Sequence, residues 1–410
     1  MSVINLETLP DSRAGWVLSN GFRPLFVLAT LQALLAITAW LAFWSGWAHP
    51  PQSMLSPVLW HGHEMLFGFV GAAMGGFLLA AVANWTGRKP VSGVSLVLLS
   101  LAWLLARIVA IGGGNWPDWL NALGAVSYWL LLAFLFGREL ILAGNRRNLK
   151  VLVIIGLFAV LSLAFHLRWL AALDVLHLAL VLVLMLLTLI GGRIIPAFTR
   201  NWLKRLAIDE TRMPSVFGPV DSVAMVLTPL AGIVWTFRPE GWAATMLLAL
   251  AGAAQLLRLT RWQGWQTRSE PLLLVLHIGY AWLGVGLLLL AGSSAGLWMP
   301  SAGLHALTIG AMGGMIMAVA SRAALGHTGR PLVAGAILTL AFMTLHLAAL
   351  ARVLAALWPS AMMTLVLVSG GLWLLAFGLF GWRYLPILLG PSLSFSERLK
   401  AEQGRQPGTK

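Results

Sequence analysis

The chain has 410 residues, of which 59% are hydrophobic and 10% charged, with a formal net charge of +14 and no cysteine. Its mean hydropathy of +0.86, together with apolar runs of about 20 residues along the whole length, predicts a polytopic helical membrane protein without a separate soluble domain. The absence of cysteine excludes disulfides, thiolate metal sites, iron–sulfur clusters and haem attached through Cys-x-x-Cys-His, so any metal needs histidine, methionine, carboxylate or backbone ligands.

Twelve apolar segments predict an all-α fold with about twelve transmembrane helices. In chain order we expect these helices to cover residues 24–46, 58–83, 92–111, 119–140, 150–170, 173–195, 218–237, 242–260, 272–291, 302–321, 332–355 and 361–384. They form one predicted transmembrane domain, 21–385, between a cytoplasmic N-terminal segment, 1–20, and a basic cytoplasmic tail, 386–410. The N-terminal segment lacks the apolar run of a secretory signal, so no removable signal peptide is expected.

The basic residues predict how the helices are oriented. Lys and Arg gather in the N-terminal segment, in alternate loops and in the tail, and only Arg107, Arg168, Arg238 and Arg352 lie elsewhere. Because cytoplasmic loops carry an excess of Lys and Arg, this distribution predicts that both termini are cytoplasmic. The charge is spread over many membrane-edge loops, so anionic lipid explains it and no nucleic-acid partner is needed.

The second predicted helix begins with the run WHGHEMLFGF, residues 60–69, which places two imidazoles and a carboxylate in an apolar span. Ionisable side chains inside a membrane are costly, so they mark a candidate functional site. At about 100° per residue, His61 and His63 project about 200° apart and cannot bind one ion from a regular helix. Each histidine can therefore serve a different cofactor, and Glu64 is a candidate acceptor that orients a ligating ring.

Small residues continue the helix face that carries His61 and Glu64, namely Gly68, Ala72 and Gly75. In lipid, helices approach each other closely through glycine and alanine. The resulting groove fits either a neighbouring helix or a flat ring, and these two interpretations of the stripe both stay open.

The depth of the histidines selects a subset of them. Those expected in the outer half of the bundle are His61, His63, His166, His177 and His305. The remaining histidines, at positions 49, 277, 327 and 346, do not share this depth. A metal site assembled from several helices is therefore expected near the outer face.

An internal repeat links the second and tenth predicted helices. Residues 63–88 align without a gap to 305–330, which matches His63 with His305 and Thr86-Gly87-Arg88 with Thr328-Gly329-Arg330. The sixth helix is a weaker third copy that begins near His177. Repeats in membrane proteins tend to build sites at their interface, so this spacing suggests three four-helix units in pseudo-threefold order.

This arrangement distantly resembles subunit I of haem-copper oxidases, in which twelve helices have pseudo-threefold order and the second opens with a His-Gly haem ligand. His61-Gly62 is followed here by Gly75-Gly76-Phe77 and Asn84-Trp85 in the same order. The chain lacks that family's His-His pair in the seventh helix and its His-Pro-Glu-Val-Tyr motif in the sixth. Oxygen reduction and proton pumping are therefore not expected.

A closer resemblance covers nearly the whole chain. The motifs that carry it are SNGFRPLF at 19–26, WHGHEMLFGF at 60–69, NWTGRKP at 84–90, NRRNL at 145–149, GGRIIPAFTRNWL at 191–203, LHIGYAWLG at 276–284, and LHALTIGAMGG with ALGHTGRPL between 304 and 332. Together they resemble the NnrS family. The resemblance implies a haem- and copper-containing twelve-span protein of the bacterial inner membrane, associated with nitric oxide metabolism and protection from nitrosative stress.

Imidazole suits both haem iron and copper, so ligand type alone does not divide the histidines between the two metals. We expect His305 and one histidine of the second helix, His61 or His63, to hold haem b between them. The other histidine of that pair and His177 are then expected to bind copper. Arg107 is the arginine we expect to pair with a haem propionate, because guanidinium binds carboxylate bidentately.

The expected partners are the lipid bilayer and nitric oxide or another small diatomic ligand, and any electron donor stays open. The rival hypothesis is a secondary transporter of a small solute or ion, which twelve helices with internal repeats also fit. A transporter usually has a polar site near the midplane, and no mid-span carboxylate is evident. A haem-based sensor or assembly factor is a third alternative, while nucleotide-binding loops and hydrolytic triads are absent from the sequence.

Overall fold

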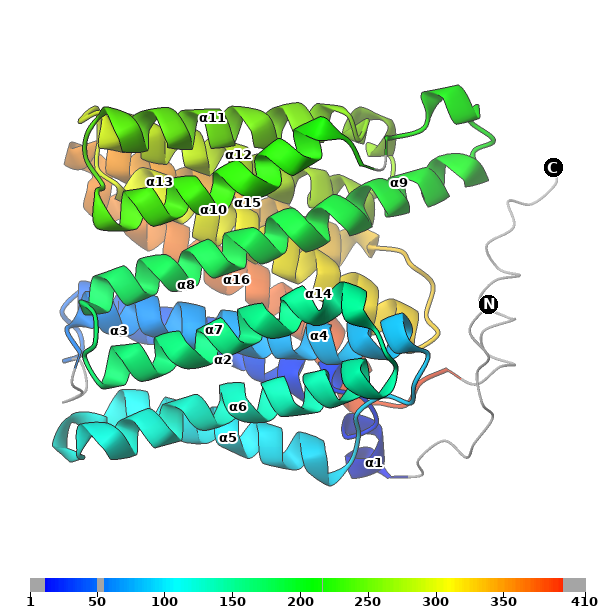
Figure 1. Ribbon diagram of the computed structural model, residues 1–410, viewed down its shortest axis with the longest axis horizontal. Helices are drawn as coiled ribbons and strands as arrows, with labels where there is room; N and C mark the ends of the chain where they lie inside the picture. Colours follow the sequence, from blue (N-terminus) through cyan, green and yellow to red (C-terminus); the bar gives the residue numbers. More distant parts are fainter. Residues whose placement is uncertain (1–11, 50–54, 216, 394–410) are drawn as a thin grey trace.

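The computed structural model describes residues 12–49, 55–215 and 217–393. Throughout this part of the chain the regular secondary structure is helical, without strands, and the long helices run side by side in one bundle (Figure 1). The α-helices are α1 (Arg13–Val17), α2 (Phe22–Trp44), α3 (Pro57–His63), α4 (Gly71–Thr86), α5 (Val94–Gly112), α6 (Asp118–Leu142), α7 (Leu149–His166), α8 (Ala172–Leu186), α9 (Gly192–Arg205), α10 (Pro219–Phe237), α11 (Trp242–Thr260), α12 (Pro271–Ser294), α13 (Ser301–His305), α14 (Gly314–His327), α15 (Gly335–Leu357) and α16 (Met362–Leu389).

Three spans contain a π-helical segment between two α-helices. These segments are η1 (Glu64–Val70), η4 (Leu187–Gly191) and η7 (Ala306–Gly313). They join α3 to α4, α8 to α9, and α13 to α14, which are the second, sixth and tenth spans. A π-turn re-aims the side chains that follow it and often marks a functional site. Short 3₁₀ turns complete the helical content: η2 (Gly113–Asn115), η3 (Arg146–Asn148), η5 (Glu210–Arg212), η6 (Gly264–Thr267) and η8 (Pro359–Ala361).

Twelve helices of the described residues are long and apolar enough to cross a membrane, which confirms the predicted all-α, multi-pass fold. Their ends agree with the predicted spans to within about four residues, except that the sixth continues to Arg205, the tenth to His327 and the twelfth to Leu389. At 1.5 Å per residue, the 34 residues of the sixth span reach about 51 Å, well beyond a hydrocarbon core of about 30 Å. Residues 1–11 and the basic tail from 394 lie outside the described residues.

Consecutive spans pack against each other, and the last span returns to the first. α16 lies against α2, where Trp373 Nε1 donates to the Ala33 carbonyl at 2.9 Å. At the other end of the same contact, Arg23 Nη1 donates to the carbonyls of Leu388 and Gly390, at 2.9 and 2.6 Å. Arg23 therefore satisfies carbonyls that the end of α16 leaves without helical partners.

The second span is the centre of the bundle. In its most apolar window 89% of the residues are buried, against 39% for the third, seventh and eighth spans, whose apolar side chains face outward. α3 and η1 contact α8, and α4 contacts α14, so the three spans that carry π-helical segments meet at the centre. This is the position that the internal repeat predicted for a shared site.

The two ends of the bundle differ in chemistry. We call the end with α3, α13 and the start of α8 the histidine end, and the opposite end, with α1 and the end of α9, the basic end (Figure 1). The described chain begins and finishes at the basic end, where Leu393 N donates to the Thr328 carbonyl at 2.9 Å. The assignment of the basic end to the cytoplasm stays a prediction from the positive-inside rule.

Candidate functional site

A cavity of about 210 Å³ lies at the histidine end, between the second, sixth and tenth spans and their neighbours. His61 of α3, His177 of α8 and His305 of α13 line it together with Arg352 of α15. The other lining residues are mostly apolar and include Trp40, Phe69, Met65, Met312 and Trp373. We call this space the histidine cavity. Three histidines far apart in sequence therefore share one largely apolar chamber.

Each of the three rings keeps a nitrogen available. His61 stacks on Trp40 at a centroid distance of 4.5 Å, and its Nδ1 is buried without a hydrogen-bond partner. His177 packs against Trp235 at 4.2 Å, and its Nδ1 is also buried and unpartnered. His305 Nδ1 lies 2.8 Å from the Ser301 carbonyl. Because a carbonyl only accepts, His305 carries its proton on Nδ1 and presents the lone pair on Nε2.

The histidine cavity carries positive charge without a carboxylate to balance it. Arg352 interacts electrostatically with both His61 and His305, and the two histidines interact with each other. Among the described lining residues no side chain is acidic. A guanidinium in largely apolar surroundings favours an anionic partner such as a carboxylate or phosphate.

A second polar cluster lies outside the histidine cavity and is built around Glu64, the first residue of η1. His63 Nδ1 lies 3.0 Å from Glu64 Oε1, Arg107 Nη1 donates to Oε1 at 2.5 Å, and Gln32 Nε2 donates to Oε2 at 2.8 Å. His63 and Glu64 are each 1% exposed, so the cluster is sealed from solvent. We call His63, Glu64, Arg107 and Gln32 the Glu64 cluster.

The helical geometry expected for His61 and His63 holds in the structure. His61 lines the histidine cavity, whereas His63 stacks on Phe67 at 4.9 Å and lies 5.6 Å from the ring of His166, outside that cavity. Both residues precede η1, in the regular helix α3, so the angle between successive side chains applies to them unchanged.

The glycine stripe on this helix accommodates neighbouring side chains. A Cβ on Gly68 would lie 2.6 Å from Arg107 Nη1, and Gly68 therefore leaves room for Arg107 to reach Glu64. Tyr128 occupies the space above Gly75 and donates from its hydroxyl to the Gly71 carbonyl at 2.7 Å. Of the two interpretations of the stripe, the structure favours close helix packing.

With this geometry described, the comparison with known families becomes informative. The family model described as NnrS protein matches residues 16–392, nearly the whole chain. The chain belongs to the NnrS family. A search among curated proteins finds no match to it. Membership identifies a nitric-oxide-related membrane protein at the family level, and the family is generally associated with haem and copper.

In this NnrS-family chain the structure groups the predicted site residues differently from the sequence. The histidine cavity brings together His61, His177 and His305, whereas His63 and Arg107 lie outside it, in the Glu64 cluster. The sequence predicted that copper binds His177 and either His61 or His63. Only His61 shares a cavity with His177, so the structure does not bring His63 and His177 together. Glu64 Oε1 lies within hydrogen-bond distance of the neighbouring His63, and its role in orienting a metal-bound ring stays a prediction.

Two residues to which the sequence assigned no metal and no propionate occupy prominent positions. Arg352 lines the histidine cavity in the place expected for Arg107, and His166 is the imidazole nearest to His63. Both were visible as outer-half residues, but depth along a span does not say which neighbour a side chain faces. Among the described residues no group of three His, Asp or Glu side chains is close enough to hold one metal ion.

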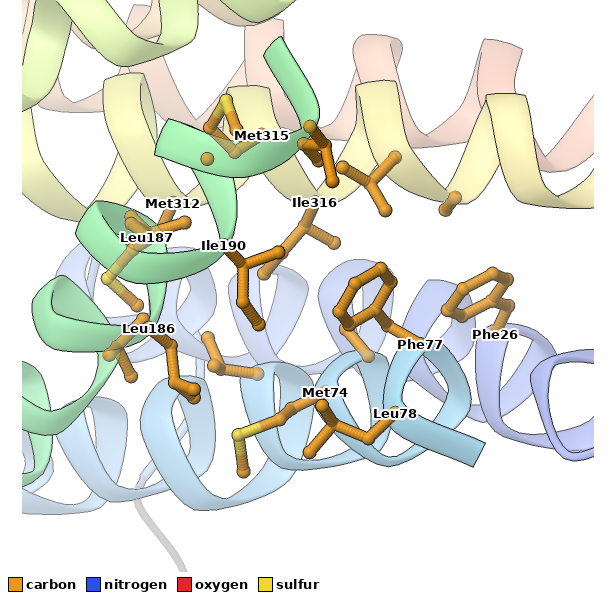
Figure 2. A pocket seen from close by; sticks show the side chains of 17 residues that line it. Phe26, Met74, Phe77, Leu78, Leu186, Leu187, Ile190, Met312, Met315 and Ile316 are labelled. Carbon is orange, nitrogen blue, oxygen red and sulfur yellow. The ribbon is translucent and has the colours of Figure 1, made fainter. Parts of the chain in front are cut away.

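A second, wholly apolar cavity of about 90 Å³ continues from the histidine cavity along the centre of the bundle. Val70 and Met312 line both cavities. Figure 2 shows Met74 and Phe77 of α4 across this space from Ile190 of η4. Toward the basic end it shares lining residues with a third cavity of about 260 Å³, beside Arg322 and His327. The middle of the bundle is therefore open to small apolar molecules and unfavourable for ions.

Proposed function

We propose that this chain binds haem b and copper at the histidine end of the bundle and acts there on nitric oxide, in nitric oxide metabolism or in protection from nitrosative stress. We propose further that it resides in the bacterial inner membrane with the histidine end toward the periplasm. The observation that carries the proposal is the convergence of His61, His177 and His305 on one largely apolar cavity.

The residues of the histidine cavity fit a haem. His61 and His305 are the residues we propose would hold the haem, since His61 Nδ1 is buried without a partner and His305 keeps Nε2 free while Nδ1 donates to the Ser301 carbonyl. His177 is a third imidazole in the same space. Arg352 is the residue we propose for a propionate, because it lines this cavity while Arg107 already pairs with Glu64.

Haem held there would supply either binding of a diatomic ligand or a one-electron redox couple. The chain's own residues set the conditions for either role. Trp40, Phe69 and Trp373 line the cavity with apolar rings, and the Ser301 carbonyl fixes the proton of His305 on Nδ1. The adjoining apolar cavity gives a neutral ligand such as nitric oxide a place to partition beside the site.

The transporter alternative receives less support from the cavities. A solute or ion crossing the centre of the bundle would have to pass the 90 Å³ cavity, whose described lining residues are all apolar apart from glycine. Polar solutes pay a desolvation cost in such surroundings without gaining hydrogen bonds. The arrangement favours neutral diatomic molecules over transported ions.

The deciding experiment is the haem content of the purified full-length protein and its histidine variants. We expect the wild-type protein to show a Soret band, and His61→Ala and His305→Ala each to lower haem per chain by at least about tenfold. His346→Ala is the matched control, because His346 lies in α15, also has unpartnered ring nitrogens and does not line the histidine cavity. A colourless wild-type protein, or full haem retention in both cavity variants, would refute the proposal.

A second measurement tests the proposed ligand. Adding nitric oxide to the reduced, haem-loaded protein should shift the haem spectrum, and Arg352→Ala should change haem affinity or midpoint potential more than Arg107→Ala does. An unchanged spectrum would contradict the proposed action on nitric oxide and would make electron transfer the better role for the haem.

A further inference from the structure

We propose that His63 and His166 together bind the copper ion, at a site separate from the histidine cavity. The inference rests on the proposed function, because copper enters as one of its two metals. It differs from the pairing expected from the sequence, since His177 lines the histidine cavity and His63 does not.

His63 has the hydrogen bonding of a metal-binding histidine. Its ring is buried at 1% exposure, Nδ1 lies 3.0 Å from Glu64 Oε1, and Nε2 has no hydrogen-bond partner. Leaving a buried ring nitrogen unpaired costs free energy, so the atom calls for a partner that the protein itself does not provide. A carboxylate that accepts from Nδ1 fixes the proton there and raises the basicity of Nε2, the usual arrangement around a ligating histidine.

The carboxylate is itself held in place. Arg107 donates to Glu64 Oε1 and Gln32 donates to Oε2, so Glu64 is oriented from both sides and remains a carboxylate acceptor for His63. Gly68 leaves the space through which Arg107 and Gln32 reach it. The Glu64 cluster thus orients the His63 ring. Burying three polar side chains to orient one histidine is costly, which favours a binding role for that ring.

His166, at the end of α7, completes the pair. Its Nδ1 lies 2.9 Å from the Ser162 carbonyl, so it also carries its proton on Nδ1 and keeps a lone pair on Nε2. The two ring centroids are 5.6 Å apart at an interplanar angle of 82°. With an imidazole nitrogen about 2.0–2.1 Å from an ion, two rings that share one ion have centroids roughly 5–6.5 Å apart.

The surroundings favour a metal that accepts few ligands. Phe67 and Phe165 pack on His63 at 4.9 and 4.8 Å, and no third His, Asp or Glu of the described chain is positioned to join the pair. Copper stands highest among the divalent first-row metals in affinity for nitrogen ligands, and Cu(I) tolerates low coordination numbers. Two imidazoles in an apolar pocket therefore suit copper better than Mg²⁺, Ca²⁺ or a closed zinc site.

The site has an opening at the histidine end. His166 lines an open cavity of about 580 Å³ together with Arg168, Trp169 and Val109. Leu59 lines both this cavity and the histidine cavity, but His166 lines this one and not the histidine cavity, so the two proposed metal sites face different cavities. A copper donor or a small ligand can approach His166 without passing the haem.

The test measures copper and haem per chain in the full-length protein, loaded with Cu(I) and with hemin. His166→Ala and His63→Ala should each lower bound copper by at least about tenfold while haem stays near the wild-type level, which also shows that the variants fold. His177→Ala is the discriminating control, because it should keep its copper. Cu(II) spectra of the wild type, after oxidation, should show nitrogen coupling that His166→Ala reduces.

The outcomes separate this inference from the proposed function. Normal copper and normal haem in both His63→Ala and His166→Ala would overturn the copper site and leave the haem proposal standing. Copper loss in His177→Ala with retention in His166→Ala would restore the pairing expected from the sequence. Absence of haem in the wild type would refute the proposed function, whatever the copper content.

Discussion

Two buried clusters of ion-paired side chains in the described part of the chain differ in whether their polar atoms are satisfied. In the second half of the chain, Arg258 Nε donates to Asp221 Oδ1 at 2.6 Å, and both residues are 1% exposed. Arg258 Nη1 also donates to the Thr188 carbonyl and to the Tyr280 hydroxyl, at 2.7 and 2.8 Å. Arg261 Nη1 donates to Asp221 Oδ2 at 2.7 Å. We call Asp221, Arg258, Arg261 and Tyr280 the Asp221 cluster.

The Glu64 cluster is similar in size and burial but is not closed. His63 Nε2 and Arg107 Nε are buried without hydrogen-bond partners, whereas Asp221, Arg258 and Tyr280 have no such atom among the described residues. A fully satisfied buried network rigidifies a fold, while an unsatisfied one requires an explanation. The Asp221 cluster therefore fits a role in holding helices together, whereas the open Glu64 cluster fits the binding site proposed above.

The largest effect that tests this contrast is expected from Arg258→Ala. Removing the guanidinium leaves Asp221 buried with Arg261 alone, and breaking a buried pair in this way costs about 3–5 kcal/mol. The melting temperature in detergent should fall accordingly, while the haem and copper content per folded chain stays unchanged. Unfolding at the wild-type temperature would show that the Asp221 cluster does not hold the bundle together.

Two glycine substitutions probe the two clusters by the same chemical change. A Cβ on Gly192 would collide with the Arg258 guanidinium, and a Cβ on Gly68 would lie 2.6 Å from Arg107 Nη1. Overpacking typically costs about 1–3 kcal/mol, and Gly192→Ala should be the more destabilising. Gly68→Ala should in addition lower copper affinity, which Gly192→Ala should not.

The control for the Gly68→Ala and Gly192→Ala variants is Gly371→Ala in α16, where a Cβ would meet nothing within 4 Å. A glycine inside a helix is less favourable than alanine by roughly 0.5–1 kcal/mol, so this variant should be neutral or slightly stabilised. Metal content and melting temperature are measured together in all three. Equal copper loss in the Gly68 and Gly192 variants would mean that copper responds to general destabilisation.

A smaller effect is expected from removing single hydroxyls. Tyr128→Phe loses the bond to the Gly71 carbonyl and should cost about 0.5–1.5 kcal/mol. Tyr280→Phe should cost more, because both Arg258 and Gln255 lose a partner in the closed cluster. Melting temperatures that place Tyr128→Phe below Tyr280→Phe would contradict the view that the Asp221 cluster is the tighter network.

The smallest effect concerns an exposed ion pair at the basic end, where Glu210 binds Lys204 and Arg200. The hydrogen bond and charge of Lys204 lower the pKa of Glu210 below its ordinary value. Because the pKa of Glu210 is lower in the folded state, its ion pairs stabilise the folded state at pH values above the unfolded pKa. This stabilisation is lost as the pH falls through the folded pKa. Glu210→Gln should therefore make limited proteolysis after α9 insensitive to acidification, with no change in metal content; unchanged pH dependence would contradict this.

Much of the fold follows from local patterns that do not depend on tertiary packing. Span positions could be predicted because a membrane segment must satisfy its backbone hydrogen bonds internally, as a helix does. It must also cover about 30 Å of hydrocarbon with apolar side chains. The separation of His61 from His63 onto opposite faces of α3 was equally predictable, since neighbouring residues of one helix have a fixed angular relation.

The sequence by itself thus determined the membrane class, the twelve spans, the family and the gathering of five histidines toward one end of the bundle. Only the tertiary structure decided that Arg352 lines the histidine cavity while Arg107 pairs with Glu64, and that His166 lies nearest to His63. Depth is a property of one helix and can be read along the chain. Which side chains face each other depends on how helices rotate and pack, and in lipid that is set by close contacts of small residues and buried polar groups that are remote in sequence.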